Sequence, residues 1–433
     1  MRPPKLHTRF LLPAAIFLGL VVAVTAISVL KIKQPTPLET ANARRLENPG
    51  FWEFQAIDTM KYSRDPSREF LGKMDVAARL VEQQVANIAQ TGATHIGIAT
   101  PYDEEFEPIM NLWVSAARRH GLLVWFRGNW SGWEKWFGYE RITREQHLSK
   151  TRAYIETHPD LFENGDIFTP CPECENGGAG DPRLNGDPKG HRQFLIDEHE
   201  MMQEAFRSIG KNITINYNSM NGDVARLIMD EPTTKALGGV IAIDHYVRTQ
   251  EKLVQDARDL AARSKGKVVF GEFGNPIPDI HGVQTPEEQA AWLEKALDLM
   301  AREPSIYGLS YWTSVGGSTE LWLSDGTAKP GVAVLTKYFT PSVIRGKVVD
   351  ARNKPIANAK IMSPQRTVFT DTYGEFIIPY THTEGQLSVE AEKFHPTKQE
   401  MSVLASQQEV LVALEQKNPT VLDRVQGIIS NWF

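Results

Sequence analysis

KVVFGEFGNP, at residues 267–276, is a short apolar strand that ends in a glutamate, Glu272, and a Gly-containing turn. The apolar run is typical of a strand buried on both faces of a parallel sheet. DIFTPCPECENGG, at residues 166–178, repeats this arrangement and reaches Glu173 about 100 residues earlier in the chain. In a barrel of alternating strands and helices, the C-terminal ends of the strands meet at one rim. The two glutamates are therefore predicted to lie on the same rim.

Six more short apolar segments alternate with stretches of helical periodicity. They lie at residues 52–58, 94–100, 122–128, 212–218, 238–246 and 306–312. Eight strand–helix units predict an α/β fold, a (β/α)8 TIM barrel at residues 49–340. A doubly wound open sheet is the alternative, but no Gly-rich phosphate loop supports it.

The pattern changes after residue 340. Apolar residues then alternate with a period of two, and turn signals separate the runs, which predicts a small antiparallel β-sandwich at residues 341–415. GKVVDARNKPIANAKI followed by FTDTYGEFII resembles the carboxypeptidase regulatory-like module, a seven-stranded transthyretin-like, Ig-like sandwich. The resemblance implies a structural or spacer role. Residues 416–433 are predicted to form an amphipathic helix that packs on the protein or lies on a membrane surface.

The N-terminus carries a targeting segment. Residues 10–30 are uncharged, and basic residues flank them on both sides. This length spans the hydrocarbon core of a bilayer as a helix, whereas the apolar region of a signal peptide is usually shorter. We expect a transmembrane anchor at residues 1–33, a linker at 34–48, and an extracytoplasmic body at the cell membrane. A cleaved signal peptide, which would leave a secreted protein, is the alternative.

Composition excludes some classes of protein. The chain has 433 residues, a net charge of -6 and a pI near 6.0, which argues against a nucleic-acid partner. Cys171 and Cys174 are the two cysteines, and a structural zinc site needs four ligands. We expect these cysteines to form a small disulfide that stiffens the loop around Glu173. No metal, no cofactor and no obligate protein partner is predicted.

Several side chains near the ends of strands have the chemistry of a sugar-binding site. Cleavage of a glycosidic bond uses two carboxyl groups, so two glutamates on one rim indicate this chemistry. Trp312 follows the last strand and offers a flat face for a sugar ring. Tyr246 is placed to hydrogen-bond Glu272 and hold it ionised, and His245 to bind a sugar hydroxyl.

These motifs resemble clan A glycoside hydrolases, family 5 in particular. The resemblance rests on the order and spacing of GEFG around Glu272, His245–Tyr246 before it, Trp312 after it, and a glutamate ending strand four. It implies a retaining mechanism in which Glu173 is the acid/base, Glu272 the nucleophile and Trp312 a subsite platform. The clan places Asn directly before the strand-four glutamate, but this chain has Pro there, so Glu175 stays open as the alternative acid/base.

The other predicted rim residues follow the remaining strands. They are Asp58, Lys61, Tyr102, Asp103, Arg127, Asn129, Trp130, Trp133, Trp136 and Asn218. Of these, Asp58, Arg127, Trp130 and Asn218 are predicted to contact substrate. The leading hypothesis is a membrane-anchored retaining glycoside hydrolase that cleaves β-linked oligo- or polysaccharides. A non-catalytic carbohydrate-binding scaffold and a transglycosylase are the alternatives.

Overall fold

The computed structural model describes residues 49–417. The anchor predicted at 1–33, the linker at 34–48 and nearly all of the helix predicted at 416–433 lie outside these residues. Within residues 49–417, no helix is both long enough and apolar enough to cross a bilayer.

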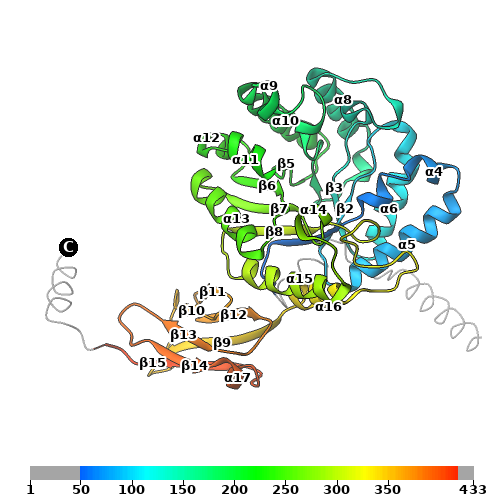
Figure 1. Cartoon of the computed structure of the whole chain (residues 1–433). Coiled ribbons are helices and arrows are strands. Elements are labelled where there is room, and N and C mark those ends of the chain that lie inside the picture. Colours follow the sequence, from blue (N-terminus) through cyan, green and yellow to red (C-terminus); the bar gives the residue numbers. More distant parts are fainter. Residues whose placement is uncertain (1–48, 418–433) are drawn as a thin grey trace, which may run out of the picture.

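Eight parallel strands form one sheet, in the order β4-β3-β2-β1-β8-β7-β6-β5 (Figure 1). They are β1 (Phe54–Asp58), β2 (His95–Ile98), β3 (Leu123–Phe126), β4 (Ile167–Phe168), β5 (Ser219–Asn221), β6 (Val240–Asp244), β7 (Lys267–Phe273) and β8 (Ile306–Tyr311). Strand β1 pairs with both β2 and β8. At the other end, a parallel bridge joins Ile167 in β4 to Thr214, in the chain that leads into β5. The sheet therefore curls into a barrel, as the sequence predicted.

Strands β4 and β5 differ most from the prediction. Strand β4 stops after two residues, because the prolines of TPCP, at residues 169–172, have no N–H to donate to a ladder. Strand β5 was predicted at residues 212–218 but begins at Ser219. The earlier segment contributes only the bridge at Thr214.

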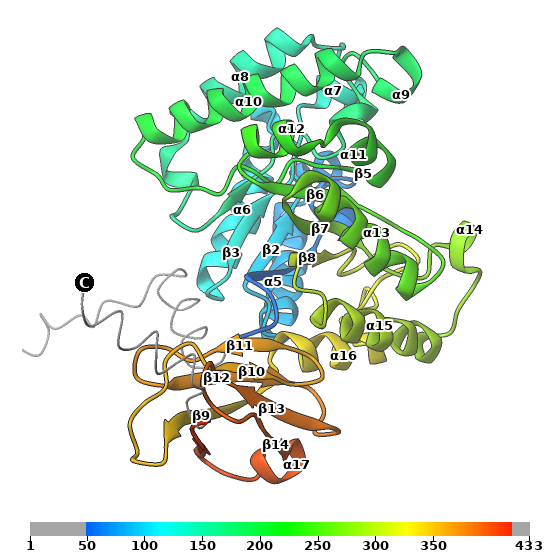
Figure 2. The same cartoon turned by 90° about the vertical axis from the view of Figure 1, so that its left-hand side faces the viewer.

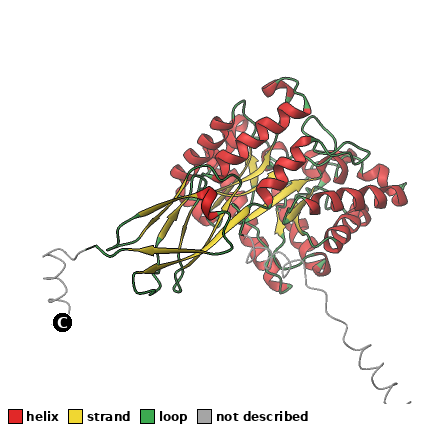
Figure 3. Cartoon of the chain, turned by 90° about the horizontal axis from the view of Figure 1, so that it is seen from below, coloured by secondary structure: helices red, strands yellow, loops and turns green. Residues whose placement is uncertain are grey.

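Helices surround this sheet, which Figure 3 shows as strands enclosed by helices. The longer ones are α5 (Met74–Gln90), α6 (Glu107–Arg119), α8 (Arg144–Thr157), α10 (Pro188–Ser208), α11 (Gly222–Ile228), α13 (Gln250–Ser264), α15 (Pro286–Ala301) and α16 (Pro330–Phe339). Shorter helices lie in the connections: α3 (Met60–Ser63), α4 (Ser67–Leu71), α7 (Ser131–Glu134), α9 (Pro182–Asn185), α12 (Glu231–Ala236) and α14 (Pro278–His281). Helix α15 illustrates the sequence signals: Thr285 and Glu288 form a capping box, and its apolar face is buried.

A separate cluster of apolar residues, drawn largely from alternate strand positions, fills part of the barrel interior. Its members are Phe54, Ala56, Trp125, Ile167, Tyr217, Val240, Ala242 and Val269. The ring of Phe54 stacks on Tyr217, with 5.1 Å between centroids, and meets the edge of Trp125 at 5.5 Å. Because strand side chains alternate between faces, the residues two positions further along belong to the same inner face. Phe54, Ala56 and Asp58 form one such series, so the inner face becomes polar where β1 ends.

Two smaller sheets follow the barrel, with the orders β11-β10-β13-β14 and β12-β9-β15. The strands are β9 (Ser342–Asp350), β10 (Lys360–Met362), β11 (Thr367–Phe369), β12 (Glu375–Tyr380), β13 (Gln386–Glu390), β14 (Thr397–Glu400) and β15 (Val410–Leu414), and α17 (Met401–Leu404) precedes the last of them. Side chains of both sheets share one buried core. The expected all-antiparallel pairing is wrong at one place, since β15 runs parallel to β9. The resemblance to a regulatory-like module stays a prediction.

The small sheets contact the barrel near α15 and α16 (Figure 2). Gln365 Nε2 donates to Asp298 Oδ1 at 2.9 Å, and Arg302 Nη1 donates to the carbonyl oxygen of Pro364 at 3.1 Å. Asp298 and Arg302 lie at the end of α15 that leads into β8. The contact is therefore on the side where the barrel strands begin, opposite the rim where they end.

Candidate active site

A polar layer covers the apolar interior of the barrel at the ends of the strands. Arg127 lies two residues after Trp125, Asp244 two after Ala242, and Ser219 two after Tyr217, so strand alternation places each of them on the inner face. Gly271 follows Val269 in the same way. A Cβ at Gly271 would collide with the Asp244 carboxylate and with Ser219. The glycine thus leaves room for this layer.

Arg127 is the centre of the layer and is 1% exposed. Its guanidinium donates to the carbonyl oxygen of Gly271 and, through Nη2, to Asp244 Oδ2 at 3.2 Å and Glu272 Oε1 at 2.9 Å. Its Nε lies 3.5 Å from Asp58 Oδ2. One buried cation therefore faces three carboxylates that come from β1, β6 and β7.

Burial changes the protonation of this cluster. It raises the pKa of Asp58 to about 6, and the charge of Glu272 adds to the rise while Arg127 opposes it. Burial and the Glu272 charge also raise the pKa of Asp244 well above its ordinary value. Burial acts to lower the pKa of Arg127, but Asp244, Glu272 and Asp58 raise it overall, so the guanidinium stays charged. Arg127 thus faces Glu272 and two buried carboxyl groups, Asp58 and Asp244, whose pKa values are raised.

Glu272 is held from two sides. Arg127 donates to Oε1, and the Tyr246 hydroxyl donates to Oε2 at 2.9 Å, as the sequence predicted for Tyr246. Along the β6–β7 ladder Ile243 pairs with Phe270, but the next residue, Asp244, pairs with Glu272, so Gly271 is skipped. This β-bulge lets both Gly271 and Glu272 approach the polar layer, although neighbouring strand residues ordinarily point to opposite faces.

Glu173 lies in the loop after β4 and has a backbone φ of 48°, which non-glycine residues rarely adopt. Its N–H donates to the carbonyl oxygen of Ser219 at 2.8 Å, and its Oε2 accepts from Asn176 Nδ2 at 2.8 Å. Burial raises the pKa of Glu173 to about 7, and the negative charge of Glu272 contributes to the rise. Glu272 therefore lies close enough for its charge to act on Glu173.

Glu175, the alternative acid, is bonded to the backbone of Asn221. It is 2% exposed, and its Oε1 accepts from the backbone N–H of Asn221 at 2.7 Å. Burial raises the pKa of Glu175 to about 7 as well, with a smaller contribution from Glu173. Glu173 is the less buried of the two glutamates and the one whose pKa responds to Glu272, so the geometry favours Glu173.

Trp312 borders the same site. Its ring meets the edge of Tyr246, with 6.2 Å between centroids, and Lys61 Nζ lies 5.6 Å from the ring centroid. A Cβ at Gly274 would collide with the carbonyl oxygen of Trp312, so the glycine permits the close approach of β7 and β8. Trp312 is half-buried, which leaves part of the ring accessible.

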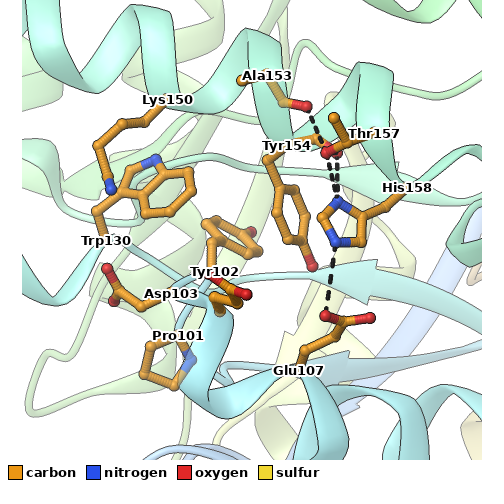
Figure 4. Close-up of a pocket in the computed structure, with 11 residues that line it drawn as sticks. Pro101, Tyr102, Asp103, Glu107, Trp130, Lys150, Ala153, Tyr154, Thr157 and His158 are labelled. Carbon is orange, nitrogen blue, oxygen red and sulfur yellow. Dashed lines mark hydrogen bonds and ion pairs between the residues drawn. The ribbon is translucent and has the colours of Figure 1, made fainter.

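The three tryptophans of the loop after β3 take different places. Trp130 lines a pocket beside α8, donates to Thr151 Oγ1 and lies beneath Lys150 (Figure 4). Trp133 is buried and stacks on Phe194. Neither Glu173 nor Glu272 lines the Trp130 pocket. The predicted grouping of these tryptophans around the sugar site is thus not seen for Trp130 and Trp133.

Trp136 is half-buried, and the Arg64 guanidinium lies over its ring at 4.6 Å. Sequence reasoning missed Arg64 and Glu134. Burial raises the pKa of Glu134 to about 7, with Arg64 opposing and Glu173 adding to the rise. Both residues therefore lie near Glu173. The sequence did contain a signal for Glu134, because it is an acidic residue among the tryptophans that follow β3.

Four residues that were predicted to contact substrate are buried. Asp58 and Arg127 are almost fully covered, and Arg127 donates to Glu272. His245 is turned away from the pair, with Nε2 2.9 Å from Asp256 Oδ2 on α13. Asn218, which alternates with the inward Ser219, is buried, and its amide has no hydrogen bond among the described residues. Tyr102 and Asp103 bond the backbone of Thr169 and Ser131.

The fold is shared with a solved structure, although no family model and no curated protein matches this chain. GH5_18 from Streptomyces cattleya in complex with GlcNAc is 16% identical, with a TM-score of 0.50 over 70% of this chain and 85% of that chain. A variant of GH5_18 from the same organism, in complex with Manβ1-4GlcNAc, is 15% identical, with a TM-score of 0.49 over 69% and 84%. The β-glucuronidase 2 of Bacteroides uniformis is 11% identical, with a TM-score of 0.43 over 78% and 44%. The first likeness shows a common barrel fold.

Replacing the central cation tests the polar layer. We expect Arg127→Met to lower the free energy of unfolding by roughly 3–5 kcal/mol, because it leaves buried carboxylates without their partner. Arg119→Met is the matched control: this exposed arginine pairs with Glu82 at the surface, where a salt bridge is worth about 0–1 kcal/mol. Urea unfolding at neutral pH measures both. Equal losses in the two variants would contradict the assignment of Arg127.

The raised pKa of Glu173 has a consequence for stability. The ordinary pKa is 4.5 and the folded value about 7, so over this range the folded chain holds a proton that the unfolded chain releases. The stability that Glu173 contributes is thus present at low pH and lost as pH rises through 7. We expect Glu173→Gln to unfold at higher urea than wild type at pH 8, with the advantage disappearing near pH 4. An advantage independent of pH would disprove the shift.

Proposed function

We propose that this chain is a glycoside hydrolase that cleaves β-glycosidic bonds in an oligo- or polysaccharide by a two-glutamate, retaining mechanism. The observation that carries the proposal is Glu272, fixed by Arg127 and Tyr246, beside a second glutamate with a pKa raised to about 7. One carboxylate accepts hydrogen bonds from a cation and a hydroxyl, and the other has a pKa raised to about 7. This is the division of labour that glycosidic cleavage requires.

In the first step, Glu173 donates its proton to the oxygen of the leaving sugar. The Glu272 carboxylate attacks the anomeric carbon and forms a covalent glycosyl-enzyme. The hydrogen bonds from Arg127 and Tyr246 orient the attacking carboxylate, whose two oxygens lie 2.9 Å from these donors. The leaving sugar departs as an alcohol, so charge and protons balance.

In the second step, Glu173 acts as the base. Burial still raises the pKa of Glu173, but once Glu272 is an ester it carries no charge, so the part of the rise that its repulsion contributed is removed. Glu173 then takes a proton from water, which attacks the anomeric carbon and releases Glu272. The starting protonation states are restored. If a sugar hydroxyl replaces water, the same steps give transglycosylation.

The aromatic rings near the pair provide subsites. Trp312 and Trp136 are both half-buried. Trp312 has Lys61 beside it and contacts Tyr246, whereas Trp136 has over its ring Arg64, whose charge acts on Glu173. Flat aromatic faces stack on the apolar faces of sugar rings, and the cations bind hydroxyl oxygens. We assign substrate binding to these two tryptophans together with Tyr246.

We further propose that the enzyme is anchored in the cell membrane with its barrel outside the cytoplasm. The proposal rests on the uncharged run at residues 10–30 and its basic flanks. Fractionation of cells that express the full-length chain tests it: the protein should stay in the membrane pellet after a high-salt wash. Release of a shorter chain into the medium would instead indicate a cleaved signal peptide.

A panel of β-linked glycans, assayed with wild type and three Glu→Gln variants, tests the catalytic roles. We expect Glu272→Gln to abolish hydrolysis and Glu173→Gln to lower kcat by roughly 10²–10⁴-fold, the usual contribution of a general acid. Glu175→Gln is the matched control and should keep most of its activity. NMR of the first product should show retained anomeric configuration. Activity that survives Glu272→Gln would sink the mechanism, and sugar binding without turnover in wild type would favour a binding scaffold.

The pH dependence of turnover tests the acid. Glu173 must carry its proton to act, so kcat/KM of wild type should fall as pH rises above about 7. Aryl glycosides with good leaving groups react without acid assistance, so the Glu173→Gln variant keeps a measurable rate on them, and its profile should lack the alkaline fall. A fall that persists in this variant would show that another group, such as Glu134, causes it.

A further inference from the structure

A buried cluster behind the Glu173 loop contains His147 from α8, Glu198 from α10 and Cys171. All three are at most 2% exposed, and one ligand atom from each lies within 4.8 Å of the others. Cys171 Sγ lies 3.7 Å from Glu198 Oε1, and His147 Nδ1 lies 3.2 Å from the same oxygen. Cys174 Sγ is at bonding distance from Cys171 Sγ, so the pair forms the disulfide that the sequence predicted.

The polar atoms of this cluster are poorly satisfied. Among the described residues, neither ring nitrogen of His147 makes a hydrogen bond of good geometry. The Glu198 carboxylate has His147 and the Cys171 sulfur as its polar neighbours there. A buried carboxylate and imidazole without donors and acceptors are costly. A cation between them would satisfy both.

The spacing of the atoms suits a tetrahedral metal. A zinc ion with bonds of about 2.3 Å to sulfur, about 2.0 Å to nitrogen and about 2.1 Å to oxygen sets S···O near about 3.6 Å and N···O near about 3.4 Å. The corresponding separations here are 3.7 and 3.2 Å. The fourth position falls to Cys174, whose sulfur adjoins that of Cys171.

We propose that the reduced chain binds one Zn²⁺ through Cys171, Cys174, His147 and Glu198, and that the disulfide is the alternative state of the same site. A dithiol transfers two electrons and two protons to the Cys171–Cys174 bond and leaves as its own disulfide. Zinc then displaces the two thiol protons and binds both thiolates. The two states exclude each other, because a disulfide sulfur is a poor ligand.

The surroundings indicate a structural site. The His147 ring meets the edge of Trp133 at 4.6 Å and Phe194 at 5.8 Å, so aromatic rings separate it from water. Four protein ligands leave no open position for a substrate. Because the two cysteines bracket Glu173, either state fixes the loop that carries this residue. The two cysteines supply only two of the four ligands that a structural zinc ion needs, and helices α8 and α10 supply the other two.

The test compares the full-length chain in its two redox states. Oxidised and phosphine-reduced samples, both stripped of metal, are titrated with Zn²⁺ against a chromophoric chelator. We expect the reduced chain to bind one more Zn²⁺ than the oxidised chain, and Co²⁺ in its place to show a thiolate charge-transfer band with tetrahedral d–d absorption. Equal zinc binding in both states, or a cobalt spectrum without the thiolate band, would overturn the proposal.

A matched pair of variants locates the site. Glu198→Gln removes one ligand and should weaken zinc binding to the reduced chain at least tenfold, whereas Glu200→Gln, an exposed residue on the same helix, should not change it. A second measurement uses the wild-type chain and so does not depend on how these variants fold. Zn²⁺ should protect both cysteines of the reduced chain from alkylation. Unprotected cysteines, or equal affinity in the two variants, would refute the assignment.

Discussion

The site depends on one buried cation. The guanidinium of Arg127 contacts the backbone of β7 and carboxylates from β1, β6 and β7, so it fixes the ends of three strands relative to each other. A lysine has one ammonium group and cannot make these contacts at once, because they need the planar fork of arginine. The orientation of Glu272 follows from this arrangement. Its second bond, to Tyr246, then leaves the carboxylate few other positions.

The sequence predicted the barrel well because strand alternation and helical periodicity are local signals. The same alternation, continued past the last apolar residue of β1, β3 and β6, places Asp58, Arg127 and Asp244 on the inner face. The prediction placed Asp58 and Arg127 at the rim and assigned both of them to substrate. The difference is one of depth: only the packed structure reveals that Asp58 and Arg127 are covered. Glu272 reaches the same layer through a β-bulge, which strict alternation does not predict.

Contacts between distant elements were the least predictable part. Trp130 and Trp133 lie in a Trp-rich loop that suggested a sugar site, yet they pack against α8 and Phe194 of α10. Helical periodicity alone does not reveal which loop a helix will cover. The ligand set around Cys171 was missed for the same reason. His147 and Glu198 are ordinary residues of two helices until tertiary packing brings them to the loop.

The two glutamates are held differently because their tasks differ. A nucleophile must stay charged and keep its orientation, and Glu272 has two donors, one of them a full positive charge. An acid that becomes a base must change its protonation state, so strong donors would trap it as a carboxylate. Glu173 accepts one neutral hydrogen bond, from Asn176. A side chain with so few bonds needs its position set by the backbone instead, which the bond to Ser219 and the link between Cys171 and Cys174 provide.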